Sequence, residues 1–277
     1  MTTKDGRFKA RDGLSLYWKA FIPDSAPKAL LHVMHGYAEH IDRYKNVIDE
    51  LVPSGYAVAG TDHRGHGRSE GKRCHVKSFD EFIADEKQFA DEIIKPMFPG
   101  IPYFVLGHSM GSIIAMNYAE QYPHMRALVL SGTGAGSGPA VPKILQLLTR
   151  ILSHLVPGIH VKSPLPADFI SHDPEVVKAY VADPLVYDVI TPRLGEQLQT
   201  YNERGYRNAN RLVMPTLIQY GSEDTSFKGQ NDLFQAVGAS DKTIKVYEGC
   251  RHEVYNELPE ARARVLSDLH AWLDKHL

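Results

Sequence analysis

Short apolar runs alternate with longer amphipathic segments along most of this chain. Four apolar runs, at residues 29–34, 56–59, 103–106 and 127–130, have the continuous hydrophobicity typical of strands buried on both faces. The segments after the first three runs repeat their apolar residues at helical spacing. This alternation predicts an α/β fold with a mostly parallel central sheet and helices on both of its faces. The expected helices cover residues 41–52, 79–94, 112–122, 231–237 and 259–273.

The two ends of the chain complete the predicted sheet. Residues 14–22 alternate in polarity and are rich in aromatic side chains, and Asp12-Gly13 before them is typical of a hairpin turn. The chain is therefore expected to open with antiparallel strands. Two further strands are expected at residues 216–220 and 243–247, each followed by a helical segment.

The alternation is interrupted after the strand at residues 127–130. A glycine-rich connector at residues 134–139 is followed by a proline-containing stretch of helices and loops. Because this insertion follows a strand of the sheet, we expect it to cover the carboxyl edge, where such sheets place their sites. The predicted organisation is a core domain of residues 1–133 and 208–277 and a cap domain of residues 134–207.

Acidic residues surround the apolar stripe of the helix expected at residues 79–94. Because charged residues on an amphipathic helix usually face water, we interpret them as a solvated helix face. These residues are Asp80, Glu81, Asp85, Glu86, Asp91 and Glu92.

Charge and composition narrow the class of protein. The 277 residues include 31 basic and 33 acidic side chains, a formal net charge of −2, so nucleic acid is not an expected partner. The two cysteines, Cys74 and Cys250, are more typical of a reducing compartment than of a disulfide-stapled secreted domain. The N-terminus lacks the apolar core of a signal peptide, and no apolar run has the length of a bilayer span. A soluble cytoplasmic protein is expected.

The stretch at residues 103–116 carries the strongest chemical signal. Four apolar residues lead into Gly107-His-Ser-Met-Gly111, and a helical run follows at once. The glycines let the backbone bend where a Cβ would clash, so Ser109 is expected at the tip of a strand-turn-helix. This is the context of a nucleophile elbow, and it predicts that Ser109 is a catalytic nucleophile rather than part of a plain turn.

A serine nucleophile needs a histidine that takes its proton and a carboxylate that holds the histidine. In folds with this elbow, the chain order is serine, acid, histidine. His252 follows a strand in a loop, whereas His270 and His276 lie on or after the last helix, so His252 is the predicted base. Asp224 is the predicted acid in preference to Glu223, because neighbouring residues point in different directions.

The negative oxygen that forms during acyl transfer needs backbone N–H donors. One is expected from the residue after the nucleophile, Met110, and the other from the loop after an early strand, at Tyr37. His35-Gly36 precedes this second donor, and a plain tight turn is the alternative interpretation of that dipeptide.

Histidines at positions 63 and 66, close to Asp62, could suggest a metal site. The order and the downstream ligands of a hydrolytic metal site are missing, so no metal is predicted. We expect Asp62, Arg64 and Ser69 to brace the loop beside the elbow instead. Cys250 lies two residues before the predicted base, and we interpret it as a small buried apolar residue rather than a redox group.

Six short stretches of the chain form a combined pattern. They are His35-Gly-Tyr-Ala-Glu-His-Ile-Asp-Arg-Tyr44, Asp62-His-Arg-Gly-His-Gly-Arg-Ser-Glu-Gly71, Gly107-His-Ser-Met-Gly111, Ala182-Asp-Pro-Leu185, Gly221-Ser-Glu-Asp224 and His252-Glu-Val-Tyr-Asn-Glu-Leu-Pro-Glu260. In this order the stretches resemble the monoacylglycerol lipase and lysophospholipase-like group of α/β-hydrolases. The resemblance covers nearly the whole chain, and the first two stretches are far more specific than the elbow.

The resemblance implies a serine hydrolase that cleaves monoacylglycerols, small lipid substrates, to fatty acid and glycerol without metal or cofactor. The head-group residues that it implies are Glu39, Arg43, Tyr180 and Tyr255. The chain departs from the family at Tyr255, where histidine is frequent, at Tyr37, where a small residue is frequent, and at Ser112, where glycine is frequent. These departures affect the expected head-group preference and not the expected chemistry.

An apolar stripe at helical spacing runs along residues 144–156 of the predicted cap. We expect it to line the acyl site and to rest transiently on a membrane surface, as an interfacial amphipathic helix does. Packing against the core is the alternative. The residues expected to line the acyl chain are Ile144, Leu145, Leu148, Ile151 and Leu152.

Two other functions compete with this interpretation. A carboxylesterase, thioesterase or lysophospholipase for other single-chain esters would differ only in the shape of the pocket. A non-catalytic ligand receptor on the same fold would be expected to lack a member of the triad, whereas this chain has Ser109, Asp224 and His252. The sequence makes no prediction of the oligomeric state.

Overall fold

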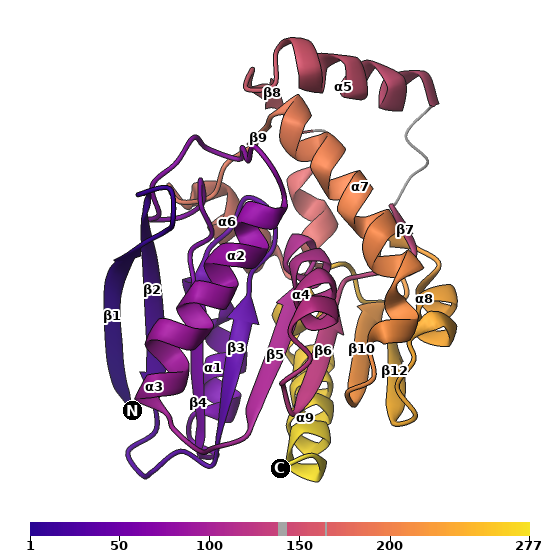
Figure 1. The fold of residues 1–277 in the computed structure, drawn as a ribbon. Coiled ribbons are helices and arrows are strands. Elements are labelled where there is room, and N and C mark those ends of the chain that lie inside the picture. The colour runs from indigo at the N-terminus through magenta and orange to yellow at the C-terminus, as the bar shows by residue number, and fades with distance from the viewer. Residues whose placement is uncertain (138–142, 164) are drawn as a thin grey trace.

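A twisted sheet of eight strands forms the centre of the protein (Figure 1). The computed structural model describes residues 1–137, 143–163 and 165–277. The strand order is β1-β2-β4-β3-β5-β6-β10-β12, and only β1 and β2 run antiparallel to their neighbours. The strands are β1 (Thr2–Lys9), β2 (Ser15–Ile22), β3 (Ala29–Met34), β4 (Tyr56–Thr61), β5 (Tyr103–His108), β6 (Ala127–Ser131), β10 (Thr216–Gly221) and β12 (Lys242–Tyr247).

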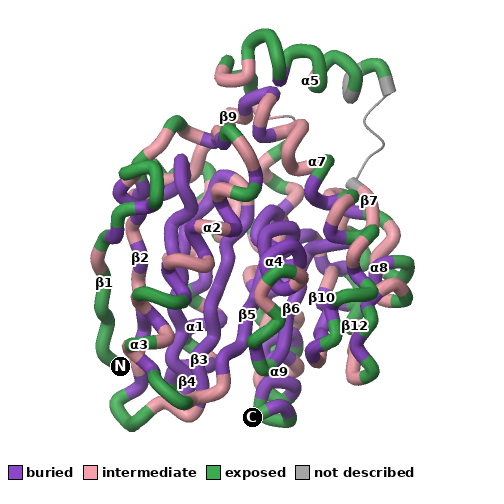
Figure 2. Tube along the Cα trace, viewed as in Figure 1, coloured by how far each residue is buried: buried purple, intermediate pink, exposed green. Residues whose placement is uncertain are grey.

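Helices cover both faces of this sheet, as the alternation of the sequence predicts. Every residue of β3, β4, β5 and β6 is buried, because successive side chains of a strand point into opposite layers. Figure 2 shows β3, β4, β5 and β6 buried at the centre of the molecule. Leu30 belongs to the hydrophobic cluster beneath α2 and α4, whereas Leu31 belongs to the cluster beneath α1 and α9. The flanking helices are α1 (Lys45–Leu51), α2 (Asp80–Phe89), α4 (Met110–Gln121), α8 (Gln230–Ala236) and α9 (Pro259–Lys275).

The elements between β6 and β10 lie above the carboxyl ends of the strands (Figure 1). Within the described part of this segment, no strand joins the eight-stranded sheet. Its elements are β7 (Gly136–Ser137), α5 (Lys143–Leu155), β8 (Val161–Lys162), η3 (Ala167–Ile170), α6 (Pro174–Ala182), β9 (Val189–Ile190) and α7 (Pro192–Arg207). The short strand β7 pairs with β11 (Phe227–Lys228), and β8 pairs with β9, two ladders that the sequence does not predict.

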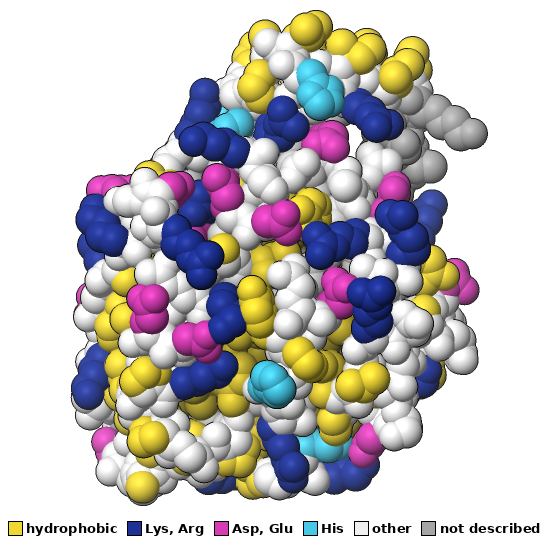
Figure 3. All heavy atoms as spheres, viewed as in Figure 1, with side chains coloured by type: hydrophobic (Ala, Val, Ile, Leu, Met, Phe, Trp, Pro, Cys, Tyr) yellow, Lys and Arg dark blue, Asp and Glu magenta, His cyan; other side chains and the backbone are white. Residues whose placement is uncertain are grey.

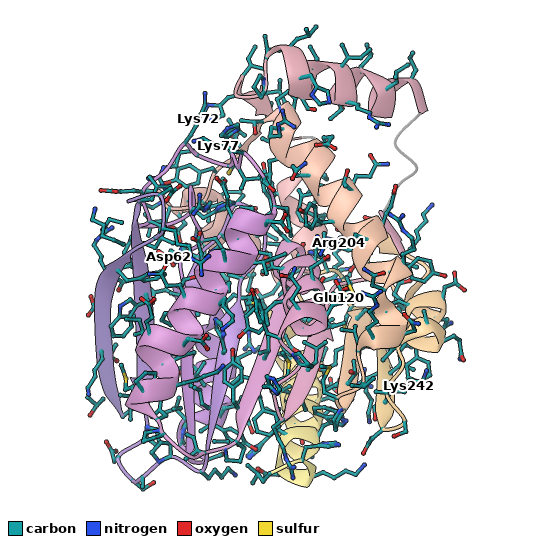
Figure 4. All side chains as sticks on the ribbon, viewed as in Figure 1. Asp62, Lys72, Lys77, Glu120, Arg204 and Lys242 are labelled. Carbon is teal, nitrogen blue, oxygen red and sulfur yellow. The ribbon has the colours of Figure 1, made fainter. Side chains whose placement is uncertain are left out.

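Helix α7 connects this segment to the core helix α4. Figure 4 shows Arg204 of α7 beside Glu120 of α4, and their charged atoms are 3.6 Å apart. Gly205 permits the close approach of the two helices, since a Cβ there would lie 3.3 Å from Met116. The amide of Asn117 donates to the carbonyl of Tyr201 at 3.0 Å.

Two acids of α2 correct the prediction of a solvated helix face. Glu86 is fully buried, and its carboxylate accepts hydrogen bonds from His32, His63 and Thr61. Asp85 is also buried and pairs with Arg64 at 2.6 Å. Burial alone would raise the pKa of Glu86, but the hydrogen bonds from His32 and His63 outweigh burial and hold it well below its usual value. The partners lie far away in the sequence, so the amphipathic pattern alone could not reveal them.

The helix expected to stop near Pro96 ends one residue later, at Met97. A π-helical turn, η2 (Ala90–Ile94), leads into the short α3 (Lys95–Met97). Pro96 lies in α3 directly after the π-helical turn, one residue before the helix ends at Met97. The remaining short helical turns are η1 (Ile41–Tyr44), η4 (Ala209–Arg211) and η5 (Val254–Asn256). Within the described residues, no helix combines the length and the apolarity that a bilayer crossing requires.

Candidate active site

Ser109 occupies a sharp turn between β5 and α4. Its φ of +53° is rare for a residue with a side chain, and it directly precedes the first residue of α4. Both flanking glycines are sterically required, because a Cβ at Gly107 would lie 2.3 Å from the carbonyl oxygen of Gly111. A Cβ at Gly111 would lie 1.9 Å from the carbonyl oxygen of Met34. The strand-turn-helix context predicted for the elbow is therefore present.

Asp224 and His252 meet on two neighbouring loops of the core. Asp224 follows β10 and His252 follows β12, and Nδ1 of the imidazole lies 2.8 Å from Oδ2 of the carboxylate. The loops touch through their main chains, since the amide of Glu223 donates to the carbonyl of Cys250 at 2.9 Å. Gly221 allows this contact, because a Cβ there would lie 2.1 Å from the same carbonyl oxygen.

The choice of Asp224 over its neighbour agrees with this geometry. The side chain of Glu223 is 55% exposed and lies 3.1 Å from His172, on the outside of the loop. The other carboxylate oxygen of Asp224 accepts the amide of Ser226 at 2.7 Å, which fixes the orientation of the group. Only Asp224 of these two acids is therefore placed to hold His252.

The electrostatics of this pair suit a histidine base. Burial would lower the pKa of His252, but the Asp224 carboxylate outweighs burial and raises it above its usual value. Burial would conversely raise the pKa of Asp224, and His252 lowers it. Because Nδ1–H donates to the acid, the neutral imidazole keeps the lone pair of Nε2 free for a proton.

A second histidine packs against the first but does not share its chemistry. The rings of His108 and His252 have centroids 4.7 Å apart. Burial, reinforced by His252, lowers the pKa of His108 to about 3, so His108 stays neutral. Gly132 lies directly against both rings. A Cβ at this position would lie 2.8 Å from His252 and 3.0 Å from His108, so a larger residue would crowd the two imidazoles.

Ser109 and His252 both line a cavity of about 340 Å³ beneath the segment between β6 and β10. This volume lies in the range of small-molecule sites. Most of the wall is apolar, with polar groups contributed by residues such as Glu39, Tyr180 and Glu253. The apolar side chains of the wall are Met110, Ile113, Leu165, Phe169, Ile170, Ile190, Leu198 and Phe227.

Tyr37 and Met110, the two expected oxyanion donors, both line this cavity. Neither backbone amide has a protein acceptor among the described residues. Nδ1–H of His35 donates to the carbonyl of Gly36 at 2.7 Å. Because C=O and N–H point in opposite directions across a trans peptide, this bond turns the Tyr37 N–H away from His35. The arrangement leaves two backbone donors available on the cavity wall.

A buried network behind the sheet edge holds His35 in place. The amide of His63 donates to Nε2 of His35 at 2.9 Å, and the two rings have centroids 3.9 Å apart. Nδ1 of His63 lies 2.9 Å from the carboxylate of Glu86, and its Nε2 lies 3.0 Å from the carbonyl oxygen of His35. The sequence motifs contain these histidines, but only the fold reveals that they connect Glu86 to the loop of Tyr37.

The loop between β4 and α2 is fixed by the residues predicted to brace it. The carboxylate of Asp62 accepts the amides of Ile41 at 3.0 Å and Arg68 at 2.8 Å. Ser69 donates to the carbonyl of Asp62, and Arg64 donates to Asp85 through two nitrogens. The expectation of a structural role for these three residues is confirmed.

Glu39 and Arg43 belong to a buried ion cluster with a third member that the sequence did not single out. Nη1 of Arg43 lies 2.6 Å from Glu39 and 2.7 Å from Glu253, and its Nη2 lies 2.7 Å from Glu253. The ring of Tyr180 covers the guanidinium, with its centroid 4.6 Å from the central carbon. Glu39, Tyr180 and Glu253 line the cavity of Ser109, whereas Arg43 does not.

Tyr255 does not lie where the expected head-group site requires it. It is buried in the core cluster under α9, and its hydroxyl donates to Gln219 at 2.8 Å. It is not among the residues that line the cavity of Ser109. Its assignment as a substrate-binding residue was wrong, because the η5 turn directs the side chain into the core, away from the cavity.

The apolar stripe of α5 faces outward rather than into this cavity. Ile144, Leu148, Ile151 and Leu152 are between 39% and 64% exposed, and none of them lines the cavity of Ser109. The side chain of Leu145 lies outside the described residues. The acyl-lining prediction for the four described residues was therefore wrong, because other elements of the cap segment, which carry Leu165, Ile190 and Leu198, stand between α5 and the serine.

Both cysteines are unpaired and buried. Cys250 packs in the hydrophobic cluster under α9, as expected of a small apolar residue. Burial raises the pKa of its thiol.

The fold and this site define an α/β-hydrolase of the serine hydrolase class. The chain belongs to the family described as Hydrolase_4, serine aminopeptidase S33, whose model matches residues 25–259. It is 37% identical to a monoacylglycerol lipase from Mycolicibacterium smegmatis over 100% of this chain and 99% of that protein. It is 33% identical to the monoglyceride lipase of Homo sapiens over 95% of this chain and 88% of that protein.

A solved structure agrees with these sequence relatives. The crystal structure of a monoacylglycerol lipase from Paleococcus ferrophilus superposes with a TM-score of 0.85 at 31% identity, covering 95% of this chain and 99% of that chain. These relatives confirm the resemblance to the monoacylglycerol lipase group that the six sequence stretches indicate.

Proposed function

We propose that this protein hydrolyses the ester bond of monoacylglycerols to fatty acid and glycerol through a covalent acyl-enzyme. The observation that carries the proposal is the single cavity in which Ser109 and His252 face a mostly apolar wall and two carboxylates. An apolar wall suits one acyl chain, and carboxylates accept hydrogen bonds from free hydroxyl groups. The named activity of relatives at 31–37% identity supports the same substrate.

The proposed mechanism begins with proton transfer from the serine. Oγ of Ser109 attacks the ester carbonyl carbon while Nε2 of His252 takes the hydroxyl proton, and Asp224 stabilises the imidazolium. The carbonyl oxygen becomes negative and accepts hydrogen bonds from the amides of Tyr37 and Met110. The ester C–O bond then breaks, and His252 gives its proton to the departing glycerol oxygen.

A water molecule completes the cycle. His252 removes a proton from this water, whose oxygen attacks the acyl carbon of the Ser109 ester. The second tetrahedral intermediate uses the same two amides, and its collapse returns the proton to Ser109 Oγ and releases the fatty acid. No metal or cofactor takes part in this scheme.

We assign the glycerol part of the substrate to Glu39 and Tyr180, with Arg43 as the charged group that holds them. Arg43 is paired on both sides and stands behind the wall. Its proposed contribution to head-group binding is therefore indirect. The division into a core of residues 1–133 and 208–277 and a cap of residues 134–207 also forms part of the proposal.

Substrate profiling tests the proposed function. We expect kcat/KM for a long-chain monoacylglycerol to exceed that for the di- and triacylglycerol of the same chain by at least about 100-fold, because a buried polar end rejects further acyl chains. A short nitrophenyl ester, a thioester, a lysophospholipid and an aminoacyl anilide are compared in the same assay, with Ser109→Ala as the blank. Faster turnover of any of these four than of the monoacylglycerol would replace the proposed substrate.

The outward face of α5 supports a further part of the proposal, transient contact with a membrane. Leu155 is 73% exposed and Leu147 is 53% exposed, and Figure 3 shows hydrophobic side chains gathered along this helix at the top of the molecule. An exposed apolar helix face of this kind is typical of interfacial helices. We accordingly propose a cytoplasmic protein that is peripheral at membranes.

Polar substitutions on this face are expected to weaken vesicle binding. In the double variant Leu148→Gln/Leu155→Gln, the helix propensity is kept while two apolar side chains are lost, so binding to phosphatidylcholine and phosphatidylglycerol vesicles should fall by about tenfold or more. Flotation of the variant with vesicles measures this. The matched control, Val213→Gln/Leu258→Gln, alters two exposed apolar residues outside α5. Equal binding of wild type and the α5 variant, or no binding by either, would contradict membrane contact through α5.

A further inference from the structure

The buried ion cluster beside the serine contains more negative than positive charge. Two carboxylates, Glu39 and Glu253, share the single guanidinium of Arg43, which gives a sum of −1. All three side chains are at most one-tenth exposed. The carboxylates line the catalytic cavity, while Arg43 is placed behind them and is covered by Tyr180. A bound molecule therefore faces the negative members of the cluster.

The hydrogen bonds of the cluster match the ionised form of both acids. Glu39 accepts from the amide of Gly36 at 2.5 Å, from Tyr44 at 2.9 Å and from Arg43. Glu253 accepts two bonds from Arg43 and a third from the side-chain amide of Asn256 at 2.8 Å. Arg43, the Gly36 amide and the Asn256 amide can only donate, which favours the ionised form of each acid. Burial, reinforced by the Glu253 charge, raises the pKa of Glu39. Burial would also raise the pKa of Glu253, but Arg43 outweighs it and lowers this pKa, so Glu253 is the firmer negative charge of the pair.

The chemistry of the site decides which part of the substrate meets these charges. His252 must reach the departing oxygen to give it a proton, so the alcohol lies beside this imidazole. Glu253 is the next residue in the chain and lines the same cavity. The aliphatic residues Ile190 and Leu198, by contrast, come from the segment between β6 and β10 and suit the acyl chain.

We propose that Glu253, together with Glu39, selects the alcohol part of the substrate by charge, admitting neutral hydroxyl-bearing alcohols and rejecting those that carry phosphate. This inference rests on the proposed ester hydrolase function and specifies its substrate class. A carboxylate accepts hydrogen bonds from the hydroxyls of glycerol, whereas it repels a phosphate in a buried site that water screens poorly. Discrimination against the wrong substrate thus comes from a repulsive group.

The same charges act on the catalytic base, which gives a second readout. The groups that face His252 are Asp224 after β10, His108 at the end of β5, Glu39 after β3 and Glu253 on its own loop. After Asp224, the two glutamates are the charges that raise the pKa of His252. Removing the charge of Glu253 should lower this pKa. Since the base works only when neutral, the acidic limb of the pH profile should move to lower pH.

The decisive experiment compares two esters that differ only in phosphate. Wild type and Glu253→Gln are assayed on a monoacylglycerol and on lysophosphatidic acid with the same acyl chain in the same detergent. The ratio of the two kcat/KM values should favour the neutral ester in wild type and should fall by about tenfold or more in the variant. The conservative variant Glu253→Asp keeps the charge and should keep most of the ratio.

A buried acid on the same loop supplies the matched control. Glu257 is 1% exposed and does not line the cavity, so Glu257→Gln should leave the ratio and the acidic limb unchanged. Active-site titration with a neutral fluorophosphonate gives the folded fraction of each variant. Selection by charge would be overturned if Glu253→Gln reacted with the fluorophosphonate but kept the wild-type ratio of kcat/KM values. It would also be overturned if wild type preferred the phosphate ester. Failure of wild type to cleave the monoacylglycerol would instead overturn the proposed function.

Discussion

Ser109→Ala is expected to lower kcat for the monoacylglycerol by about 10⁴-fold or more, because the substitution removes the atom that attacks the ester. Alanine keeps the Cβ, so the positive φ of this residue is no more strained than in wild type. The melting temperature should stay within about 3 °C of the wild-type value. Steady-state hydrolysis and thermal unfolding of the same preparation measure the two effects.

A neighbouring serine provides the control for this substitution. Ser112 is buried three residues further along α4, and its hydroxyl donates to the carbonyl of Ser109 at 2.6 Å. Ser112→Ala should retain activity within about tenfold, because only a local hydrogen bond is lost. If Ser109→Ala kept more than a few per cent of the activity, another residue would have to be the nucleophile.

Asp224→Asn is expected to reduce kcat by about 10³-fold to 10⁴-fold. The asparagine amide can donate to Nδ1 of His252, which would place the imidazole proton on Nε2, where the lone pair is needed. Loss of the carboxylate also removes the main cause of the raised pKa of His252, so the residual activity should have its acidic limb at lower pH. A pH profile of kcat/KM measures both consequences.

The adjacent acid distinguishes a specific role from a general loss of charge. Glu223 is exposed and contacts His172 rather than His252, so Glu223→Gln should change kcat by no more than about threefold. A large effect at Glu223 with a small one at Asp224 would reverse the assignment of the acid.

Local patterns predicted most of the core and the three residues that we propose as the triad. The strands from β3 to β6 are buried on both faces, so each appears in the sequence as a continuous apolar run. Ser109 could be predicted because the glycines on either side form a pattern within five residues, although the contact that demands Gly111 comes from Met34 of β3. His252 and Asp224 could be predicted because each follows a strand and the chain order of the fold is fixed.

Features that depend on distant partners could not be predicted in the same way. Glu86 is part of an amphipathic helix, and its burial depends on His32 and His63, which come from other elements. Glu253 follows the predicted base directly and was not singled out, although the family resemblance already implied Glu39 and Arg43, its partners in the ion cluster, as head-group residues. The two-residue strands β7, β8, β9 and β11 are too short to produce a periodic pattern.

The stripe on α5 shows why an amphipathic pattern alone does not identify its partner. Helical spacing establishes that one face is apolar, but the same face could line a cavity, pack on the core or remain exposed. Leu148 and Ile151 remain exposed, and Ile190 of β9 and Leu198 of α7 are among the aliphatic residues that line the cavity instead. Tyr255 is a related case, since a residue three positions after the base can point into the core as readily as into the site.

The loop of His252 binds both the loop of Asp224 and the segment that forms the upper wall of the cavity. The amide of Glu223 donates to the carbonyl of Cys250 at 2.9 Å, and the amide of Glu253 donates to the carbonyl of Ile170 in η3 at 2.8 Å. Phe169 of η3 packs on the His252 ring, with centroids 5.2 Å apart. Substitutions at Ile190 and Leu198 can therefore alter the chain-length preference without touching the base, whereas changes in η3 would also displace His252.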